Sequence, residues 1–301
     1  MMIYKTKLGH CLIVSFFMVW GLSFVFMGFA FSEDLPEIKE RGILRHLGVP
    51  YANFVTGSGD GLDVEVVRLF AQHLGVEYQY VKSSWNDIIG DLTGKKVKAK
   101  CNDIEIIGEV PIKGDIIANG MTILAWRTKI VDFSIPAFPT QVWLIARADS
   151  SIKPINPSGD MDTDISMVKA LLGNREVMVK LKTCLAPGLY RLEETSAKFK
   201  YFKGNLNELA PAIINGEAET TLLDVPDALI ALKKWPGRIK VIGPISHPQT
   251  MGYAFSKTSP ELRDAFNRFF KQCRKDGTYR SLAKKYYPSV FMYYPDFLNK
   301  K

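Results

Sequence analysis

Short apolar segments with strand character alternate with helical segments along most of this 301-residue chain. The pattern predicts strands over residues 43–49 and 77–81, with a helix over residues 63–74 between them. Asp63 stands at the N-cap position of that helix, and Gly75 ends it. Strands that alternate with helices at this spacing are typical of a parallel, doubly wound sheet flanked by helices. The feature therefore predicts an α/β fold.

The second half of the chain repeats this rhythm without a visible sequence repeat. The sequence predicts strands over residues 177–180, 199–202, 220–223 and 239–242 and helices over residues 185–194, 206–215 and 225–232. A helix that begins at Pro260 places apolar residues on one face at helical spacing, which predicts a core-facing stripe. A last helix covers residues 278–287. The chain thus holds two α/β units of about 100 residues each.

The N-terminus carries the pattern of an exported protein. Lys5 and Lys7 precede an apolar run, and Ala30 and Ser32 are small residues at the positions that a signal peptidase reads. We therefore expect residues 1–32 to be a signal peptide and the mature protein to be periplasmic. The apolar run is about 20 residues long, which is also enough to span a bilayer, so a retained anchor stays open.

The composition is that of a globular protein, with 47% hydrophobic and 23% charged residues. The net charge is +8, but the basic residues are scattered apart from Lys95, Lys96, Lys98 and Lys100, and no nucleic-acid motif appears. The four histidines are also scattered, so we expect neither a metal nor a cofactor. Export permits disulfides, yet the sequence does not choose between a bridge with one free thiol and three free thiols at Cys101, Cys184 and Cys273.

A hydroxyl and a guanidinium follow the apolar strand predicted at residues 115–118. Thr122 comes after the turn residue Gly120, and Arg127 comes five residues later. Arginine offers a planar fork of donors that matches the two oxygens of a carboxylate, and threonine adds a further donor. A lone arginine near a strand end is usually a solvated surface charge. The prediction of a carboxylate site therefore depends on the other residues that accompany Arg127.

The stretch from Gly120 to Arg127, continued by Val131-Asp-Phe-Ser134, resembles the signature of the family 3 extracellular solute-binding proteins, the polar amino-acid receptors of bacterial import systems. The resemblance extends over almost the whole mature chain, including residues 37–47, 61–64, 259–266 and 276–279. It implies a two-lobed clamp of the type II periplasmic-binding-protein kind. Residues 33–143 and 249–301 would form lobe 1, residues 144–248 would form lobe 2, and the ligand would bind between them.

The resemblance also implies which residues hold the ligand. Arg127, Thr122 and Gly120 would surround its carboxylate, and Asp224 would hold its ammonium from lobe 2. A zwitterion loses its water without a large penalty only when both charges meet partners, so the two facing charges are physically coherent. The alternative for Asp224 is a helix N-cap ahead of Val225.

Four more residues complete the predicted site. Thr183 and Lys180 stand where the family places a Gly-Thr-Thr turn, although this sequence reads Lys182-Thr183-Cys184. In the family, aromatic side chains flank the ligand, and Trp85 and Tyr51 match those positions. Phe54 is a candidate either for such a position or for the core.

The chain departs from the family pattern in four places. Leu124 replaces the second threonine of the signature, and Ala137-Phe138 stands where two aromatic residues are usual. Residues 95–112 form an insertion in which residues 104–110 alternate like part of a hairpin, and the aromatic tail from residue 289 to 301 exceeds the family's normal end.

We therefore expect a monomeric periplasmic binding protein rather than an enzyme, which hands an amino acid or a similar small zwitterion or carboxylate to an inner-membrane ABC permease. One alternative is a sensory or docking protein with a degenerate cleft. The other is an enzyme similar to the cyclic-acid dehydratases on this fold, which needs a general acid. Glu217, Glu219 and Asp227 are its candidates.

Overall fold

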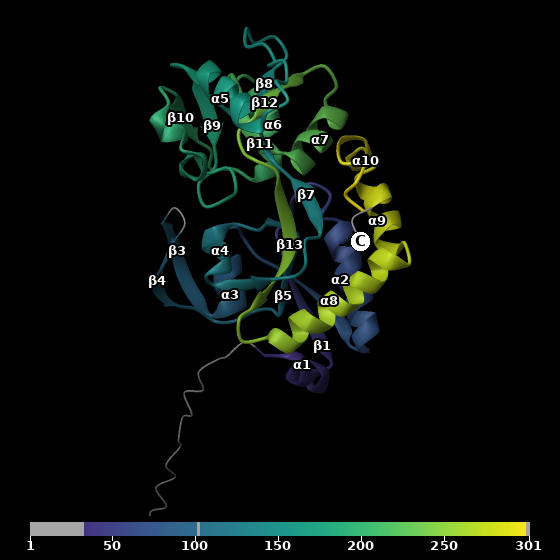
Figure 1. The fold of residues 1–301 in the computed structure, drawn as a ribbon. Coiled ribbons are helices and arrows are strands. Elements are labelled where there is room, and N and C mark those ends of the chain that lie inside the picture. The colour runs from purple at the N-terminus through teal and green to yellow at the C-terminus, as the bar shows by residue number, and fades with distance from the viewer. Residues whose placement is uncertain (1–32, 101–102, 299–301) are drawn as a thin grey trace, which may run out of the picture.

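The computed structural model describes residues 33–100 and 103–298, and it shows two lobes, one above the other in Figure 1. We call the lower part lobe 1. Its six-stranded sheet has the order β2-β1-β5-β13-β6, and β7 pairs with β13 outside that path. The strands are β1 (Ile43–Gly48), β2 (Glu77–Lys82), β5 (Ile116–Thr122), β6 (Val131–Phe133), β7 (Phe138–Thr140) and β13 (Gln249–Ser256). The β1–β2 and β1–β5 pairs are parallel, as the alternating sequence predicts, whereas β13 runs antiparallel to its neighbours.

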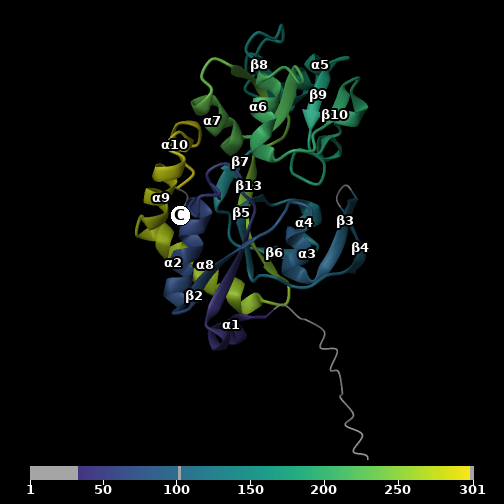
Figure 2. The same ribbon diagram turned by 180° about the vertical axis from the view of Figure 1, so that it is seen from behind.

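Helices from both ends of the chain pack on this sheet (Figures 1 and 2). They are α1 (Leu35–Arg41), α2 (Leu62–Leu74), α3 (Ile88–Thr93), α4 (Ala125–Thr128), α8 (Pro260–Lys275) and α9 (Thr278–Tyr286). The predicted stripe of α8 is confirmed, because its apolar residues from Leu262 to Cys273 are buried. Phe266 and Phe270 of that stripe pack on Tyr253 of β13, which fixes α8 against the sheet.

The upper part, lobe 2, contains a five-stranded mixed sheet of order β10-β9-β11-β8-β12. Its strands are β8 (Val142–Arg147), β9 (Glu176–Val179), β10 (Lys198–Tyr201), β11 (Thr220–Asp224) and β12 (Ile239–Pro244). The helices are α5 (Met161–Leu172), α6 (Leu209–Ile214) and α7 (Val225–Lys234), with 3-10 turns at Pro187–Tyr190, Leu192–Glu194 and Leu206–Glu208. The α/β two-lobed fold is thus the one that the sequence predicts.

Two chain connections join the lobes, between β7 and β8 and between β12 and β13 (Figures 1 and 2). Gln141 lies in the first connection, and its Nε2 donates to the carbonyl of Ser246 in the second at 2.7 Å. Ser246 Oγ in turn accepts from the amide of Val142 at 2.9 Å. The two connections are therefore joined by hydrogen bonds, and we call them together the hinge. The predicted lobe boundaries, which divide the chain at residues 143/144 and 248/249, stay predictions.

Three details of the secondary structure differ from the sequence-based expectation. The helix expected over residues 185–194 is two 3-10 turns, because Arg191 between them has a left-handed backbone with φ of 55°. α5 was not expected at all. Asp63 lies inside α2 rather than at its N-cap, which is Gly61. Gly61 has a φ of 139°, and a Cβ there would lie 2.2 Å from the carbonyl oxygen of Phe54.

The insertion forms a hairpin of β3 (Lys95–Lys100) and β4 (Asp103–Glu109), which confirms the expected hairpin. Its charges are largely balanced, because Lys95 pairs with Glu109 in register and Lys98 pairs with Glu105. Lys129 Nζ contacts Asp103 Oδ1 at 2.8 Å, which ties the hairpin to the segment after α4.

Some expectations fall outside the described residues. The signal peptide at residues 1–32 and Cys101 are among them, so both stay predictions. Cys184 and Cys273 are free thiols. Within the described part of the chain, no helix is long and apolar enough to cross a membrane. The tail continues past α9 into a short helix, α10 (Val290–Tyr293).

Candidate functional site

The carboxyl end of β5 places Thr122 and Arg127 in the interior of the protein. Thr122 is the last residue of β5, and α4 begins three residues later and carries Arg127. The Arg127 side chain is not a solvated surface charge, since the residue is only 2% exposed. Its Nη1 donates to the carbonyl of Thr122 at 2.8 Å, which fixes the guanidinium against the strand end.

Both residues keep polar atoms without a partner. Within residues 33–100 and 103–298, neither Thr122 Oγ1 nor Arg127 Nε has a hydrogen-bond partner, although both atoms are buried. Burial lowers the pKa of Arg127 from its usual value, and the nearby groups Cys184, Tyr190 and Asp224 oppose that shift. A buried polar atom that lacks a partner is costly, so these two donors are suited to an incoming oxygen.

Asp224 lies at the corresponding end of β11 in lobe 2 and is 1% exposed. It occupies the N-cap position of α7, yet its side chain makes no capping hydrogen bond. Burial raises the pKa of Asp224 to about 6, although hydrogen bonds from Tyr51 and Cys184 act in the opposite direction. With this pKa, the carboxyl group of Asp224 is mostly ionised at neutral pH.

Tyr51 brings lobe 1 into contact with this carboxylate. Its hydroxyl donates to Asp224 Oδ1. The ring packs edge-to-face on Trp85, with centroids 5.7 Å apart, and the buried Nε1 of Trp85 has no partner within the described residues. Phe54 lies in the core instead, since it is 1% exposed and packs on Phe138. Tyr51 thus contacts Asp224 directly, and Trp85 packs beside Tyr51. The ring of Phe54 stacks on the ring of Tyr51.

Cys184 lies among the candidate site residues, although the sequence reasoning did not single it out. Its Sγ donates to Asp224 Oδ2 at 3.5 Å, and the hydroxyl of Tyr190 donates to its carbonyl at 2.5 Å. Burial, with the charge of Asp224, raises the pKa of the Cys184 thiol, so the sulfur stays protonated. The signal was present in the sequence, because Cys184 directly follows Thr183 in the altered Gly-Thr-Thr turn.

Three predicted site residues use their polar groups in hydrogen bonds within the protein. Lys180 Nζ donates to the carbonyl of Gly204 at 2.6 Å. Thr183 Oγ1 donates to the carbonyl of Lys180 at 2.8 Å and accepts from the amide of Leu185. The amide of Gly120 donates to Asp63 at 2.7 Å. The structure therefore groups Arg127, Thr122, Asp224, Tyr51 and Trp85, whereas direct ligand contacts by the other three have less support.

A second carboxyl group is buried close to Asp224. Asp227, in the first turn of α7, is 6% exposed. Burial, followed by the charge of Asp224, raises the pKa of Asp227 well above its ordinary value. The Asp227 carboxyl group therefore holds its proton more tightly than an ordinary aspartate does.

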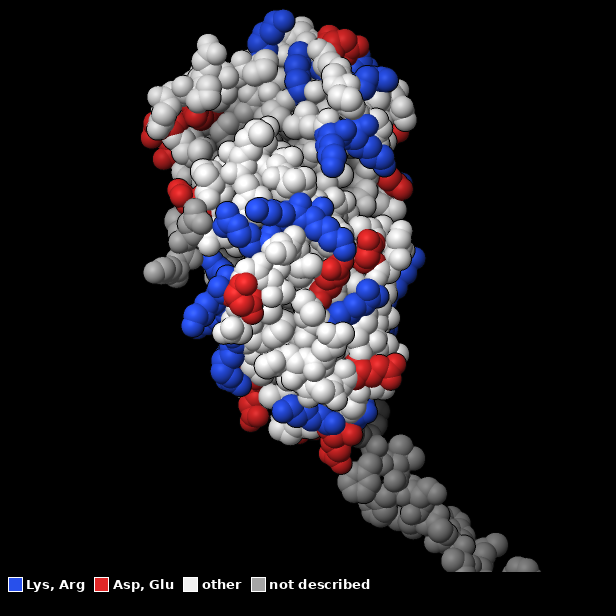
Figure 3. Space-filling view, turned by 90° about the vertical axis from the view of Figure 1, so that its right-hand side faces the viewer, with Lys and Arg blue, Asp and Glu red and all other residues white. Residues whose placement is uncertain are grey.

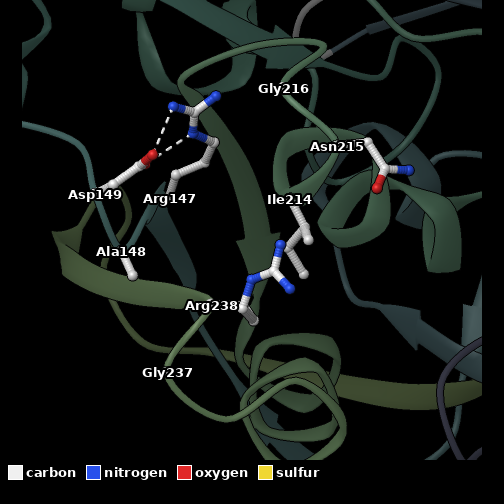
Figure 4. A pocket seen from close by; sticks show the side chains of 8 residues that line it. All are labelled: Arg147, Ala148, Asp149, Ile214, Asn215, Gly216, Gly237 and Arg238. Atoms are coloured by element: carbon white, nitrogen blue, oxygen red, sulfur yellow. Dashed lines mark hydrogen bonds and ion pairs between the residues drawn. The ribbon is translucent and has the colours of Figure 1, made fainter.

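A separate pocket of about 300 Å³ lies in lobe 2 between the ends of α6, β8 and β12 (Figure 4). Arg147 and Asp149 face each other on one side of it, with a 2.9 Å contact, and Arg238 projects from the loop that carries Gly237. None of the predicted site residues lines this pocket. No cluster of three or more His, Cys, Asp or Glu side chains suited to a metal ion occurs in the described segments.

The sequence model of the bacterial extracellular solute-binding proteins, family 3, matches residues 112–289, which is more than half of the chain. The chain belongs to this family. The matched region includes the Gly120–Arg127 signature, the hinge, all of lobe 2 and helices α8 and α9.

Curated relatives are similar over most of this chain. It is 25% identical to the membrane-bound lytic murein transglycosylase F of Desulfosudis oleivorans over 76% of its own length, but it spans only 44% of that relative. It is also 25% identical to the L-cystine-binding protein TcyJ of Escherichia coli K12, over 86% of this chain and 88% of the relative.

Solved structures share the fold. A mutant of the arginine-binding protein of T. maritima superposes with a TM-score of 0.66 at 24% identity, covering 84% of this chain and 99% of that one. An ancestral amino-acid-binding protein, described as a precursor of cyclohexadienyl dehydratase, superposes with a TM-score of 0.64 at 26% identity, with coverage of 84% and 98%.

Proposed function

We propose that this protein is a periplasmic binding protein that captures an amino acid, or a similar small zwitterion, between its lobes and delivers it to an inner-membrane ABC permease. One observation carries the proposal. A buried arginine with a free Nε and a buried ionised aspartate, from different lobes, lie close enough for each to influence the pKa of the other. Family membership and the names of the amino-acid-binding relatives support the ligand class.

The two charges have complementary tasks. Arg127 and Thr122 offer donors that suit the ligand's carboxylate, whereas Asp224 offers an acceptor that suits its ammonium. Because the groups belong to different lobes, a ligand that bridges them binds the closed form better than the open one. Binding therefore favours closure.

Thermal shift and calorimetric titration with the twenty amino acids and L-cystine test this proposal. At a concentration one hundred times its dissociation constant, a true ligand stabilises the folded state by about 2.7 kcal/mol. Arg127→Ala and Asp224→Asn should each strongly reduce that shift. Arg191→Ala is the matched control, because this exposed arginine pairs with Glu194 on the surface. Equal binding by all three variants would place the ligand elsewhere.

A dehydratase-like enzyme is the second candidate, and Asp227 is the observation that favours it. A buried carboxyl group with a raised pKa beside a second carboxylate is a candidate general acid. Turnover of a cyclic carboxylic acid that disappears in Asp227→Asn would support this activity. A protein that binds amino acids and shows no such turnover would support the first proposal alone.

A further inference from the structure

The chain continues beyond the region that matches the family. The match ends at residue 289, and α10 and the residues after it follow. In Figures 1 and 2, α10 lies beside α7, above α9 and level with the junction of the two lobes. The tail therefore reaches lobe 2 although it leaves from a helix of lobe 1.

Aromatic rings of the tail contact both sides of the hinge. Tyr293 packs on Trp143 of β8, with ring centroids 6.0 Å apart and planes at 60°. Phe297 packs on Phe138 of β7, with centroids 5.2 Å apart. Trp143 and Phe138 lie on opposite sides of Gln141 in the outward connection, so the tail spans the point at which the chain changes lobes.

The ring packing continues from the tail to the proposed ligand site. Phe297 packs on Phe138, and the ring of Phe138 packs on Phe54 with centroids 5.1 Å apart. Phe54 in turn stacks on Tyr51 with centroids 6.2 Å apart. Tyr51 then donates to Asp224 of lobe 2. Tyr294 of the tail is also close enough to Asp224 for that charge to add to burial in raising the pKa of the tyrosine to about 12.

We propose that residues 290–298 form a strap across the hinge that holds the lobes closed and so controls ligand exchange at the site. The role in ligand exchange rests on the proposed binding function. The mechanical part does not, because it concerns only the equilibrium between open and closed lobes.

Opening the lobes breaks direct hydrogen bonds besides the strap contacts. Among them are the Tyr51–Asp224 bond and the bond from the amide of Ala52 to Asn207 Oδ1 at 2.8 Å. Both start from the loop that Phe54 supports. The strap stabilises closure twice, by the direct Tyr293–Trp143 contact and by the packing that keeps Tyr51 in place.

Residues Pro288 to Pro295 carry no charged side chain, and Asp296 follows them. Figure 3 shows this side of the molecule with two groups of basic side chains, one at mid-height and one higher up, and an uncharged area between them. Exposed bases of α9 and α7, including Lys284 and Lys233, lie on the two lobes that the strap joins. Like charges on both lobes repel one another, so these surface bases do not favour closure, whereas the ring contacts of the strap do.

Small-angle X-ray scattering of the ligand-free protein tests the strap directly. Tyr293→Ala removes the ring contact with Trp143, and Phe297→Ala removes those with Phe138 and Tyr279. Loss of one aromatic pair should shift the closed-to-open ratio by roughly two- to twelve-fold and enlarge the radius of gyration. Tyr293→Phe keeps the ring and should scatter like the wild type. Met292→Ala is the matched control, since Met292 is 79% exposed in the same short helix.

Hydrogen exchange separates opening from local fraying. In the two alanine variants, the amide of Ala52 should exchange faster together with the tail, because its partner Asn207 lies on the other lobe. Unchanged scattering and unchanged Ala52 exchange would overturn the strap, as would a wild type that is already open in solution. If the strap variants open the lobes but the protein binds no amino acid, the strap is supported and the proposed function is rejected.

Discussion

The hydroxyl of Tyr51 in lobe 1 donates to the carboxylate of Asp224 in lobe 2. Asp224 thereby takes part in a bond between the lobes and in the proposed site for the ligand's ammonium. An ionised carboxylate has about four lone-pair positions, so it can accept from Tyr51 and Cys184 and still receive an ammonium. In the proposed function, ligand binding and lobe closure therefore depend on the same side chain.

Tyr51→Phe should raise the pKa of Asp224 above about 6, because the Tyr51 hydrogen bond lowers it in the native protein. The loss of one buried donor to a charged acceptor should also reduce the free energy of unfolding by about 1.5–3 kcal/mol at pH 8. Nuclear magnetic resonance of the labelled carboxyl carbon measures the pKa, and urea unfolding measures the stability.

Tyr201→Phe is the control for this change. Tyr201 lies on β10 and is 55% exposed, so removal of its hydroxyl should alter neither the pKa of Asp224 nor the stability. An Asp224 pKa that stays the same in Tyr51→Phe would show that the inter-lobe bond does not form in solution.

Much of the fold is predictable because local patterns and tertiary packing agree. The apolar stripe of α8 and the strand–helix alternation of lobe 1 both appear where the sequence places them. The helix predicted over residues 185–194 is wrong because Arg191 adopts a left-handed backbone conformation. That conformation is rare for arginine and has no sequence signal. α5 was missed, although Asp160 caps it through the amide of Thr163.

The site was only partly predictable for a different physical reason. The sequence shows which chemical groups follow each strand, so it allowed Arg127, Thr122 and Asp224 to be proposed as site residues. It does not show which polar atoms find a partner nearby. Lys180 is an example, because its ammonium is bound by the carbonyl of Gly204, which lies 24 residues further along the chain. The involvement of Cys184 likewise depends on the closeness of β11 to the preceding loop.

Gly120→Ala should destabilise the protein strongly. Gly120 has a φ of +66°, and a Cβ there would lie 2.3 Å from Cδ2 of the buried Phe54 ring. The ring supports Tyr51 and cannot move without disturbing the core, so the free energy of unfolding should fall by about 2–4 kcal/mol. Thermal and urea unfolding measure the change.

Gly42→Ala separates steric overlap from backbone strain. Gly42 has a similar φ of +74°, but nothing lies within 4 Å of the position of its Cβ. This substitution should cost only about 1 kcal/mol. Equal losses in the two variants would mean that the Phe54 contact does not limit residue 120.

Asp63→Asn should flatten the pH dependence of stability. Burial raises the pKa of Asp63 to about 7 in the folded protein, against 3.8 as its ordinary value. The folded state therefore binds the proton more tightly than the unfolded state, and the free energy of unfolding falls as pH rises from about 4 to 7. Asparagine resembles the protonated acid and can still accept from the amide of Gly120 and donate to the oxygen of Tyr253.

The variant should be more stable than the wild type at pH 8 by roughly 1–4 kcal/mol, and the two should converge near pH 4. Urea unfolding between pH 4 and 8 provides the comparison. Asp264→Asn is the control, because Asp264 is an exposed partner of Arg263. Parallel curves for wild type and Asp63→Asn would show that Asp63 is ionised throughout this range.

Ligand affinity should weaken as the pH falls through the pKa of Asp224. A ligand ammonium binds the ionised carboxylate, and in the free protein that group has a pKa of about 6. At pH 7 most molecules are competent, whereas at pH 5 about one in ten is, so the dissociation constant should rise about tenfold. Calorimetry at pH 5, 6 and 7, with the amino acid that gives the thermal shift, measures this dependence.

Two variants make the assignment specific to Asp224. Asp224→Asn should bind weakly and equally at all three pH values, because the amide does not titrate in this range. Tyr51→Phe should move the midpoint of the pH dependence upwards, since the bond from Tyr51 lowers the pKa of Asp224. A wild-type affinity that is constant from pH 7 to 5 would mean that the ligand's cation does not contact Asp224, and the carboxylate would then serve lobe closure alone.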